Sequence, residues 1–330
     1  MRAQRLARPG AIEKGPLTLE DRPVPEPGPG EVLLRVAACG VCHTDLHIVE
    51  GELSPPRLPL IPGHQVVAEV VRAGDGAELK PGTPVGVPWL GWACGECAFC
   101  QRGEENLCRQ ARFTGFHSDG GFAEHMLASA AFVLPLPEGL SPVEAAPLLC
   151  AGIIGYRSLH RAELAPGERL GLIGFGASAH LALPVALSWG CRVFVFTRSA
   201  QHQRLALRLG AEWAGGIEQQ PPGELDRAIL FAPVGDLVPQ ALSRLRPGGT
   251  LAINAVHLSP IPSLSYDRIY GERSLRTVAN ATRRDGREFL SLATKLGLRP
   301  TVAAYPLQDA NIALGDLKHS RLESAAVLVL

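Results

Sequence analysis

The sequence lacks a net charge, a long apolar run and a recognisable secretion signal. Its 32 Lys and Arg residues balance 32 Asp and Glu residues, which argues against a nucleic-acid or polyanion binder that relies on bulk charge. The longest apolar runs, such as 181–187, fall far short of the ~20 residues that a membrane span requires. The basic start, MRAQRLARPG, is not followed by the apolar core of a secretory signal. We therefore expect a cytoplasmic protein without membrane or nucleic-acid partners.

The length and the distribution of turn residues predict two domains. A chain of 330 residues exceeds a typical domain of ~100–200 residues. The N-terminal part is rich in Pro and Gly, and its short β-type runs at 31–37 and 65–71 are bounded by Pro-Gly turns. This pattern favours an antiparallel, partly barrel-like domain. From about Ala151 strands alternate with helices, which predicts a parallel sheet with crossovers. The predicted parallel strands cover 169–173, 191–196, 227–231 and 250–253, the last entered by Pro247-Gly-Gly.

Four cysteines form the strongest local motif, Cys94-x2-Cys97-x2-Cys100-x7-Cys108. Four thiolates at this spacing can form the tetrahedral cage of a structural zinc site. A bacterial iron–sulfur motif would use x3 before the fourth cysteine and then Pro, whereas here the gap is seven and Arg109 follows. Four unliganded cysteines in one loop would be an oxidation liability. In a reducing compartment the cysteines indicate metal binding rather than disulfides.

Three further residues are candidate metal ligands, but no local spacing connects them. Cys42 lies in CGVCHTDLH, His64 in PGHQ and Cys150 in PLLCAG. Taken singly, a Cys after Leu-Leu is usually a small buried hydrophobe, and Pro-Gly-His is often only a turn. Cys39 and Cys42 have redox-pair spacing but lack the βαβ setting of such pairs. The residues alone leave these alternatives open.

A glycine turn, GFGASA from Gly174, follows a predicted strand and opens a helix over 177–189. It matches the dinucleotide fingerprint, in which the first Gly makes the turn and the second lets the backbone approach a pyrophosphate. The free N–H groups of the helix start would bind the phosphates. We therefore predict that Gly174, Gly176 and Ala177 contact a dinucleotide, and that Pro184 kinks the helix.

The second strand of this unit ends without the acidic residue that binds the adenosine ribose of NAD. Thr197, Arg198 and Ser199 stand there instead. Without a carboxylate a 2′-phosphate is not repelled, and Arg198 can pair with it while the hydroxyls donate hydrogen bonds. The alternative is that Arg198 only solvates the strand end. We predict a preference for NADP over NAD.

Together, CGVCHTDLH, PGH, the four-cysteine lobe and PLLCAG, in this order before the glycine turn, resemble the zinc-dependent medium-chain alcohol dehydrogenases. GFGASAH and FTRS are similar to a bacterial branch of zinc-binding alcohol dehydrogenases. The resemblance implies an α/β fold: a GroES-like, mainly antiparallel β domain (1–151) holding the zinc lobe (94–108), a Rossmann domain (152–279) and a C-terminal segment (280–330) that completes the first. It also implies two zinc ions per subunit, with the catalytic ion held by Cys42, His64 and Cys150.

The resemblance also implies an activity, namely reversible oxidation of a primary or secondary alcohol with hydride transfer to NAD(P). Zinc would lower the pKa of the alcohol, with Thr44 and then His47 moving its proton to solvent. His43 would contact the coenzyme pyrophosphate. Trp89 would line the substrate pocket and restrict it to small or slender alcohols, although ordinary core packing is an alternative. We expect a homo-oligomer, a dimer or tetramer, that acts on a small alcohol or aldehyde.

Three positions qualify the resemblance. Asp45 matches the family carboxylate that orients the histidine ligand. Gln65 stands where the family usually has Glu, so exchange of water for substrate is expected to slow. Ala325 replaces a phosphate-binding arginine, with Arg321 nearby but out of register, so looser coenzyme binding is expected. The alternatives are an NADPH-dependent aldehyde reductase on the same site and a non-catalytic zinc- and coenzyme-binding protein, which Gln65 and Ala325 favour.

Overall fold

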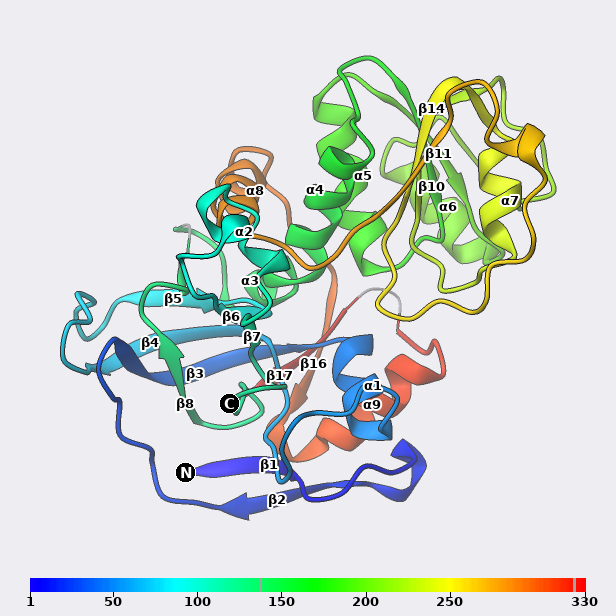
Figure 1. Ribbon diagram of the computed structural model, residues 1–330. Coiled ribbons are helices and arrows are strands. Elements are labelled where there is room, and N and C mark those ends of the chain that lie inside the picture. Colours follow the sequence, from blue (N-terminus) through cyan, green and yellow to red (C-terminus); the bar gives the residue numbers. More distant parts are fainter. Residues whose placement is uncertain (137, 323–324) are drawn as a thin grey trace. The chain divides into compact units, whose positions relative to one another are not determined.

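The computed structural model describes residues 1–136, 138–322 and 325–330, and they form two compact units (Figure 1). Unit 1 contains Met1–Cys150, Asn280–Ser291 and Arg299–Leu330. Unit 2 contains Ala151–Ala279 and Leu292–Leu298. The C-terminal part of the chain therefore contributes mainly to unit 1, and its short segment Leu292–Leu298 belongs to unit 2.

Unit 1 is built on a mainly antiparallel sheet with the strand order β16-β17-β3-β4-β5-β9, and β8 also pairs with β3. Two smaller antiparallel pairs, β1–β2 and β6–β7, accompany it. The strands are β1 (Arg2–Leu6), β2 (Leu17–Asp21), β3 (Glu31–Val41), β4 (Gln65–Ala73), β5 (Pro84–Val87), β6 (Leu90–Trp92), β7 (Arg112–Phe113), β8 (His125–Ser129), β9 (Leu134–Pro135), β16 (Val302–Pro306) and β17 (Ala325–Val329). The α-helices are α1 (His43–Glu50), α2 (Ala98–Gln101), α3 (Pro142–Ala145), α9 (Ala310–Lys318) and the first part of α8 (Arg283–Lys295); the residues of α8 from Leu292 on belong to unit 2.

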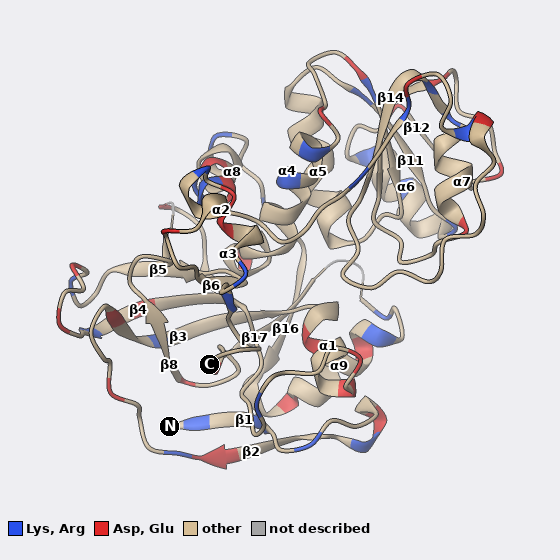
Figure 2. Ribbon diagram, viewed as in Figure 1, with Lys and Arg blue, Asp and Glu red and all other residues tan. Residues whose placement is uncertain are grey.

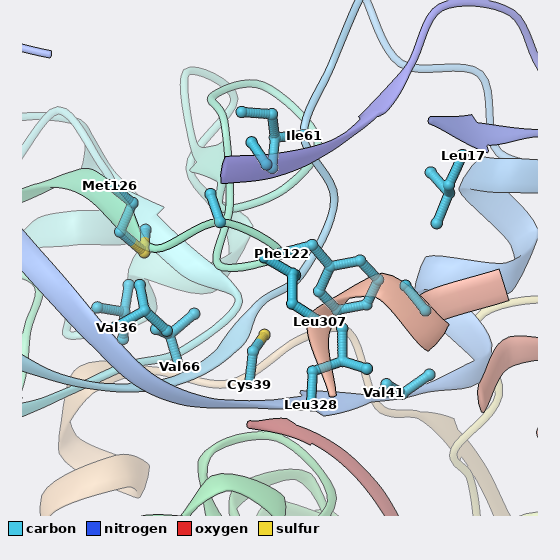
Figure 3. Packing of buried hydrophobic residues seen from close by; sticks show 14 of the residues in the cluster. Leu17, Val36, Cys39, Val41, Ile61, Val66, Phe122, Met126, Leu307 and Leu328 are labelled. Atoms are coloured by element: carbon cyan, nitrogen blue, oxygen red, sulfur yellow. The ribbon is translucent and has the colours of Figure 1, made fainter. Parts of the chain in front are cut away.

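The core of unit 1 packs between this sheet and the segments that cross it (Figure 3). Phe122 and Cys39 are fully buried, and the Cys39 thiol donates to the carbonyl of Gly40 at 3.6 Å. Alternating apolar residues of β3 and β4, such as Val36 and Val66, point into the same cluster. This core fixes the end of β3 and the start of β4. Two of the candidate metal ligands, Cys42 and His64, lie next to these points.

Unit 2 has a six-stranded sheet with the order β12-β11-β10-β13-β14-β15, and every neighbouring pair is parallel. The order runs outward in both directions from β10, as in a doubly wound fold. The strands are β10 (Arg169–Ile173), β11 (Arg192–Phe196), β12 (Trp213–Gly215), β13 (Leu225–Leu230), β14 (Leu245–Ile253) and β15 (Ser274–Thr277). The helices are α4 (Ala151–Arg161), α5 (Ala177–Ser188), α6 (Ala200–Arg208) and α7 (Leu237–Leu242).

The two largest differences between the expected and the observed strand bounds are in β3 and β14. β3 continues to Val41 rather than ending near 37, because its outer end pairs with both β4 and β17. β14 begins at Leu245, so Pro247-Gly-Gly lies inside the strand instead of before it. The pairing of β14 with β13 shifts register in this stretch, and such an irregularity accommodates a Pro that has no N–H to donate.

Within the described ranges, no helix combines the length and the apolar character needed to cross a membrane. Figure 2 shows acidic and basic residues interspersed over both units, in keeping with the balanced composition.

Candidate active site and cysteine lobe

The structure brings Cys42, His64 and Cys150 together, with their ligand atoms within 4.8 Å of one another. The antiparallel pairing of β3 with β4 explains the first two: Gly40 is opposite Gln65, so the end of β3 meets the start of β4. Cys42 follows β3 and caps the N-terminus of α1, where its sulfur accepts the N–H of Thr44 at 3.3 Å. Cys150 follows the short 3-10 helix Ala146–Leu149.

Asp45 holds this group in place from a fully buried position. Its Oδ2 accepts the N–H of Cys42 at 3.0 Å, and its Oδ1 accepts the N–H of Gly63 at 3.1 Å. Oδ1 also lies 2.9 Å from Nδ1 of His64. Because a carboxylate only accepts, it selects the ring form with the proton on Nδ1. The lone pair of Nε2 is then left for another partner.

Nε2 of His64 is buried, and no described residue gives it a hydrogen-bond partner. Burial opposes protonation of this ring, but the negative charges of Asp45 and Cys42 outweigh burial and raise the pKa of His64 to about 10. These charges therefore attract a positive charge to Nε2, either a proton or a metal ion that takes the place of the proton. The hydrogen bond between the two sulfurs lowers the pKa of Cys42 well below its usual range and raises that of Cys150 well above it. Two adjacent sulfurs and an unpartnered imidazole nitrogen are the donor set of a Cys2His zinc site with an open position.

Gly63 is required by the close packing behind His64. Its φ of +101° is in the region that only glycine adopts readily. A Cβ at this position would lie 2.5 Å from the ring of Phe122 and 2.9 Å from the sulfur of Cys39. The side chain of Gln65, the next residue after His64, is buried and packs against Gly40 of β3.

Aromatic rings form a wall beside His64. The Trp89 ring stands edge-on to His64, with centroids 4.9 Å apart and planes at 75°. It stacks on Phe113 at 5.0 Å and 8° and contacts Phe116 at 5.9 Å. Its Nε1–H donates to Oδ1 of Asn280 at 3.0 Å. Sequence analysis identified Trp89 but missed the other three residues, because no local motif marks them.

The three other predicted residues of this region lie on α1. Thr44 is buried, His47 is half-buried and His43 is exposed, and the two histidine rings are 6.4 Å apart. Nδ1 of His47 contacts the carboxylate of Glu52, which sequence analysis also missed. Gly51, at φ +87°, ends the helix just before Glu52. Such a helix-ending glycine is the one sequence signal for this contact, because it indicates that the helix ends there.

The four cysteines of the lobe also come together, with all sulfurs within 4.8 Å of one another. Cys94 lies 3.9 Å from Cys100 and 3.6 Å from Cys108. Ligands at ~2.3 Å from a tetrahedral zinc are about 3.8 Å apart, so this spacing fits the ion closely. Backbone N–H donors, first among them that of Cys100, lower the pKa of Cys97 to about 7. That direction favours the thiolate, which is the form that binds metal.

An ion pair joins the lobe to the C-terminal segment of unit 1. Arg283 at the start of α8 donates to both carboxylate oxygens of Glu105 at 2.6–3.0 Å. The guanidinium also lies 4.2 Å from the ring centroid of Phe132. Glu105 is nearly buried; burial alone would raise its pKa, but the hydrogen bonds from Arg283 outweigh burial, so the pKa of Glu105 is lowered.

In unit 2 the glycine turn has the geometry of an anion-binding helix start. Gly174 has φ +90°, and a Cβ there would lie 2.8 Å from the amide nitrogen of Ala232. A Cβ at Gly176 would meet nothing within 4 Å, so its backbone is open to an approaching ligand. The first turn of α5, from Ala177, has no side-chain cap, which leaves N–H groups for a phosphate. Helix α5 continues through Pro184 to Ser188.

Thr197, Arg198 and Ser199 follow β11 directly. The backbone of Thr197 is held on both sides, since its N–H donates to Gly215 and its carbonyl accepts from Gln203. Ser199 caps α6 by accepting the N–H of His202 at 3.2 Å. Arg198 is exposed. In unit 1, Ala325 begins β17, and Arg321 pairs with Asp316 of α9 at 3.2 Å.

Comparisons with known proteins agree with this geometry. The alcohol dehydrogenase GroES-like domain matches residues 28–138. The probable alcohol dehydrogenase AdhA of Mycobacterium tuberculosis is 50% identical, over 100% of this chain and 97% of the relative. The thermostable alcohol dehydrogenase of Pyrobaculum aerophilum, solved with cobalt and zinc, is 25% identical with a TM-score of 0.91, covering 100% of this chain and 99% of that one. CAD from Helicobacter pylori, solved with NADP(H), is 26% identical with a TM-score of 0.87 and the same coverage.

These findings confirm the predicted fold class and the predicted oxidoreductase that acts on alcohols with a nicotinamide coenzyme. The chain belongs to the zinc-type medium-chain alcohol dehydrogenase family.

Proposed function

We propose that this alcohol dehydrogenase holds a catalytic zinc ion with Cys42, His64 and Cys150 and transfers hydride between a small alcohol and NADP. The observation that carries the proposal is the buried Nε2 of His64, which has no hydrogen-bond partner in the described chain, in a residue whose ring lies within 4.8 Å of the sulfurs of Cys42 and Cys150. A zinc ion at these three ligands supplies a Lewis acid that lowers the pKa of the substrate hydroxyl. Asp45 sets the ring form of His64 that can bind it.

A second zinc ion has a structural role in the lobe. Cys94, Cys97, Cys100 and Cys108, whose sulfurs lie within 4.8 Å of one another, would hold it as four ligands and would leave no position open to substrate. The ion replaces the packing that so short a lobe cannot provide for itself. Only four buried apolar or cysteine residues form the cluster described there: Leu90, Ala93, Cys108 and Phe132.

Thr44 and His47 move the proton of the substrate hydroxyl. Thr44 is buried, and its N–H donates to the sulfur of Cys42, so this residue lies directly beside one of the three ligands that would hold the zinc ion. His47 is one helical turn later and half-buried, so it can pass a proton to solvent. The Trp89 ring packs against His64 and so borders the place where the alcohol would bind. Its bulk favours small or slender alcohols.

NADP binds along the glycine turn. Gly174, Gly176 and Ala177 offer backbone N–H groups to the pyrophosphate. A pyrophosphate contact from His43 remains a prediction of the family resemblance. Thr197, Arg198 and Ser199 stand where the adenosine ribose is read, and none of them is acidic. A 2′-phosphate would meet the guanidinium of Arg198, which is exposed at the strand end. A homo-oligomeric state and a cytoplasmic location remain predictions of the sequence.

The test is the initial rate of oxidation of alcohols from ethanol to benzyl alcohol, followed at the absorbance of the reduced nicotinamide, with NAD and NADP in parallel. We expect turnover with a clear preference for NADP. A preference for NAD would leave the dehydrogenase intact and refute the role of Arg198. Cys150→Ser should abolish turnover with little change in the thermal midpoint, because a serine hydroxyl is a poor zinc ligand; Cys191→Ser, outside both metal groups, is the matched control.

A further inference from the structure

The indole of Trp89 lies beside the ring of His64, with the ring centroids 4.9 Å apart. Trp89 precedes β6 and Phe113 ends β7, and the two strands pair with Leu90 opposite Phe113. The carbonyl of Trp89 also accepts the N–H of Thr114 at 2.9 Å. The backbone under the indole is therefore fixed. The side chain of Trp89 can still change orientation by rotation of the ring.

Stacking alone does not fix that rotation. The bond between Cβ and the ring is an sp3–sp2 torsion with a broad energy minimum. A half-turn about this bond keeps the indole in the same plane, so the contact with Phe113 at 8° tolerates either orientation. The half-turn does move the six-membered ring to the other side and carries Nε1 away. The hydrogen bond from Nε1 to Asn280 at 3.0 Å therefore distinguishes the two orientations.

Both the backbone and the side-chain amide of Asn280 suit it to accept this hydrogen bond from Trp89. Its φ is +55°, in the left-handed region that Gly, Asn and Asp adopt more readily than other residues. It begins the C-terminal segment of unit 1 and is 191 residues from Trp89 in the chain. Asn and Asp combine this backbone conformation with a short acceptor, whereas Gly provides only the conformation.

We infer that Asn280 is a specificity-determining positioning residue, which locks the Trp89 indole in one orientation against His64 and so keeps the substrate site narrow. The inference rests on the proposed function, in which Trp89 borders the substrate. Asn280 acts through Trp89 and not on the reacting atoms. Loss of its acceptor lets the indole turn, and kcat/KM then rises more for bulky alcohols than for small ones.

Three variants of the full-length, zinc-loaded enzyme test this. Asn280→Gly removes the acceptor without backbone strain, Asn280→Asp keeps an acceptor, and Trp89→Ala removes the wall. The readout is the ratio of kcat/KM for benzyl alcohol to that for ethanol. We expect this ratio to rise about fivefold to tenfold in Asn280→Gly, as loss of one neutral hydrogen bond implies. It should stay near the wild-type value in Asn280→Asp and rise most in Trp89→Ala.

A second readout separates positioning from folding. Quenching of Trp89 fluorescence by acrylamide, isolated by subtracting a Trp89→Phe variant, should increase in Asn280→Gly and not in Asn280→Asp. If Trp89→Ala changes the ratio but Asn280→Gly does not, the inference is overturned while the proposed site stands. If Trp89→Ala also leaves the ratio unchanged, Trp89 does not border the substrate and that part of the proposed function fails with it. Equal effects of Gly and Asp at position 280 would also overturn the inference.

Discussion

Replacement of Asp45 by Asn tests the organisation of the catalytic group most directly. The carboxylate accepts backbone N–H groups from Cys42 and Gly63 and contacts Nδ1 of His64. An asparagine of nearly the same size keeps one oxygen, which can still face Gly63 and His64. Its NH2 group then replaces the oxygen that faces Cys42, so two donors meet in a fully buried position. Both the start of α1 and the position of the Cys42 sulfur depend on this contact.

The size of the effect follows from these contacts. One hydrogen bond to a charged acceptor is lost, and two donors, the N–H of Cys42 and the new NH2 group, face each other without an acceptor. Together these changes should cost about 3 kcal/mol of stability in unit 1. The loss of the carboxylate behind the histidine ligand should also weaken zinc binding about 10- to 100-fold.

Zinc affinity is measured by competition with a chromophoric chelator, and stability by the thermal midpoint of the zinc-loaded protein. Asp119→Asn is the matched control, because Asp119 also accepts a backbone N–H, that of Ile61 at 3.0 Å, but is only half-buried and pairs with Arg57. It should change neither quantity by much. Asp45→Asn with the zinc affinity and thermal midpoint of the wild type would refute the assignment of Asp45.

Three further predictions concern the lobe and the coenzyme. Cys94→Ser should leave about one zinc ion per chain instead of two and lower the thermal midpoint, because a structural site needs four ligands; metal analysis measures this. Arg198→Ala should raise the KM for NADP about tenfold, as loss of a charge-assisted bond to a 2′-phosphate implies, with the KM for NAD unchanged in steady-state kinetics. Glu105→Gln should destabilise the protein by about 2 kcal/mol near pH 7 because it breaks the bidentate pair with Arg283. Since the pKa of Glu105 is lowered from 4.5, this contribution is present above pH 4.5 and is lost as the pH falls through the lower, folded-state value, which thermal unfolding across this range would detect.

Each of these predictions has a result that contradicts it. Retention of both zinc ions in Cys94→Ser would mean that three cysteines suffice or that the lobe holds no zinc. Arg208→Ala, at the exposed C-terminal end of helix α6, controls for loss of one positive charge from the same unit, and an equal effect on NADP would remove the special role of Arg198. A destabilisation by Glu105→Gln that persists unchanged at low pH would show that the ion pair is not its cause.

The sequence by itself determined those features that depend on neighbouring residues. The four-cysteine lobe could be predicted because 15 residues hold all four ligands, and chain geometry alone lets them meet. The glycine turn was equally local, since Gly174 must adopt a positive φ between a strand and a helix. The alternation of strands and helices predicted the parallel sheet of unit 2, although the bulged start of β14 was placed too late.

Only the tertiary structure decided which distant residues meet. Cys42 and His64 come together because the end of β3 pairs with the start of β4, and Cys150 joins them from a third segment. Spacing could not predict this ligand set; a family resemblance suggested it. Contacts such as Trp89 with Asn280 had no sequence signal, because they depend on sheet register and on a left-handed backbone that packing selects. The free energy of such contacts comes from burial and hydrogen bonds that exist only once the whole unit has folded.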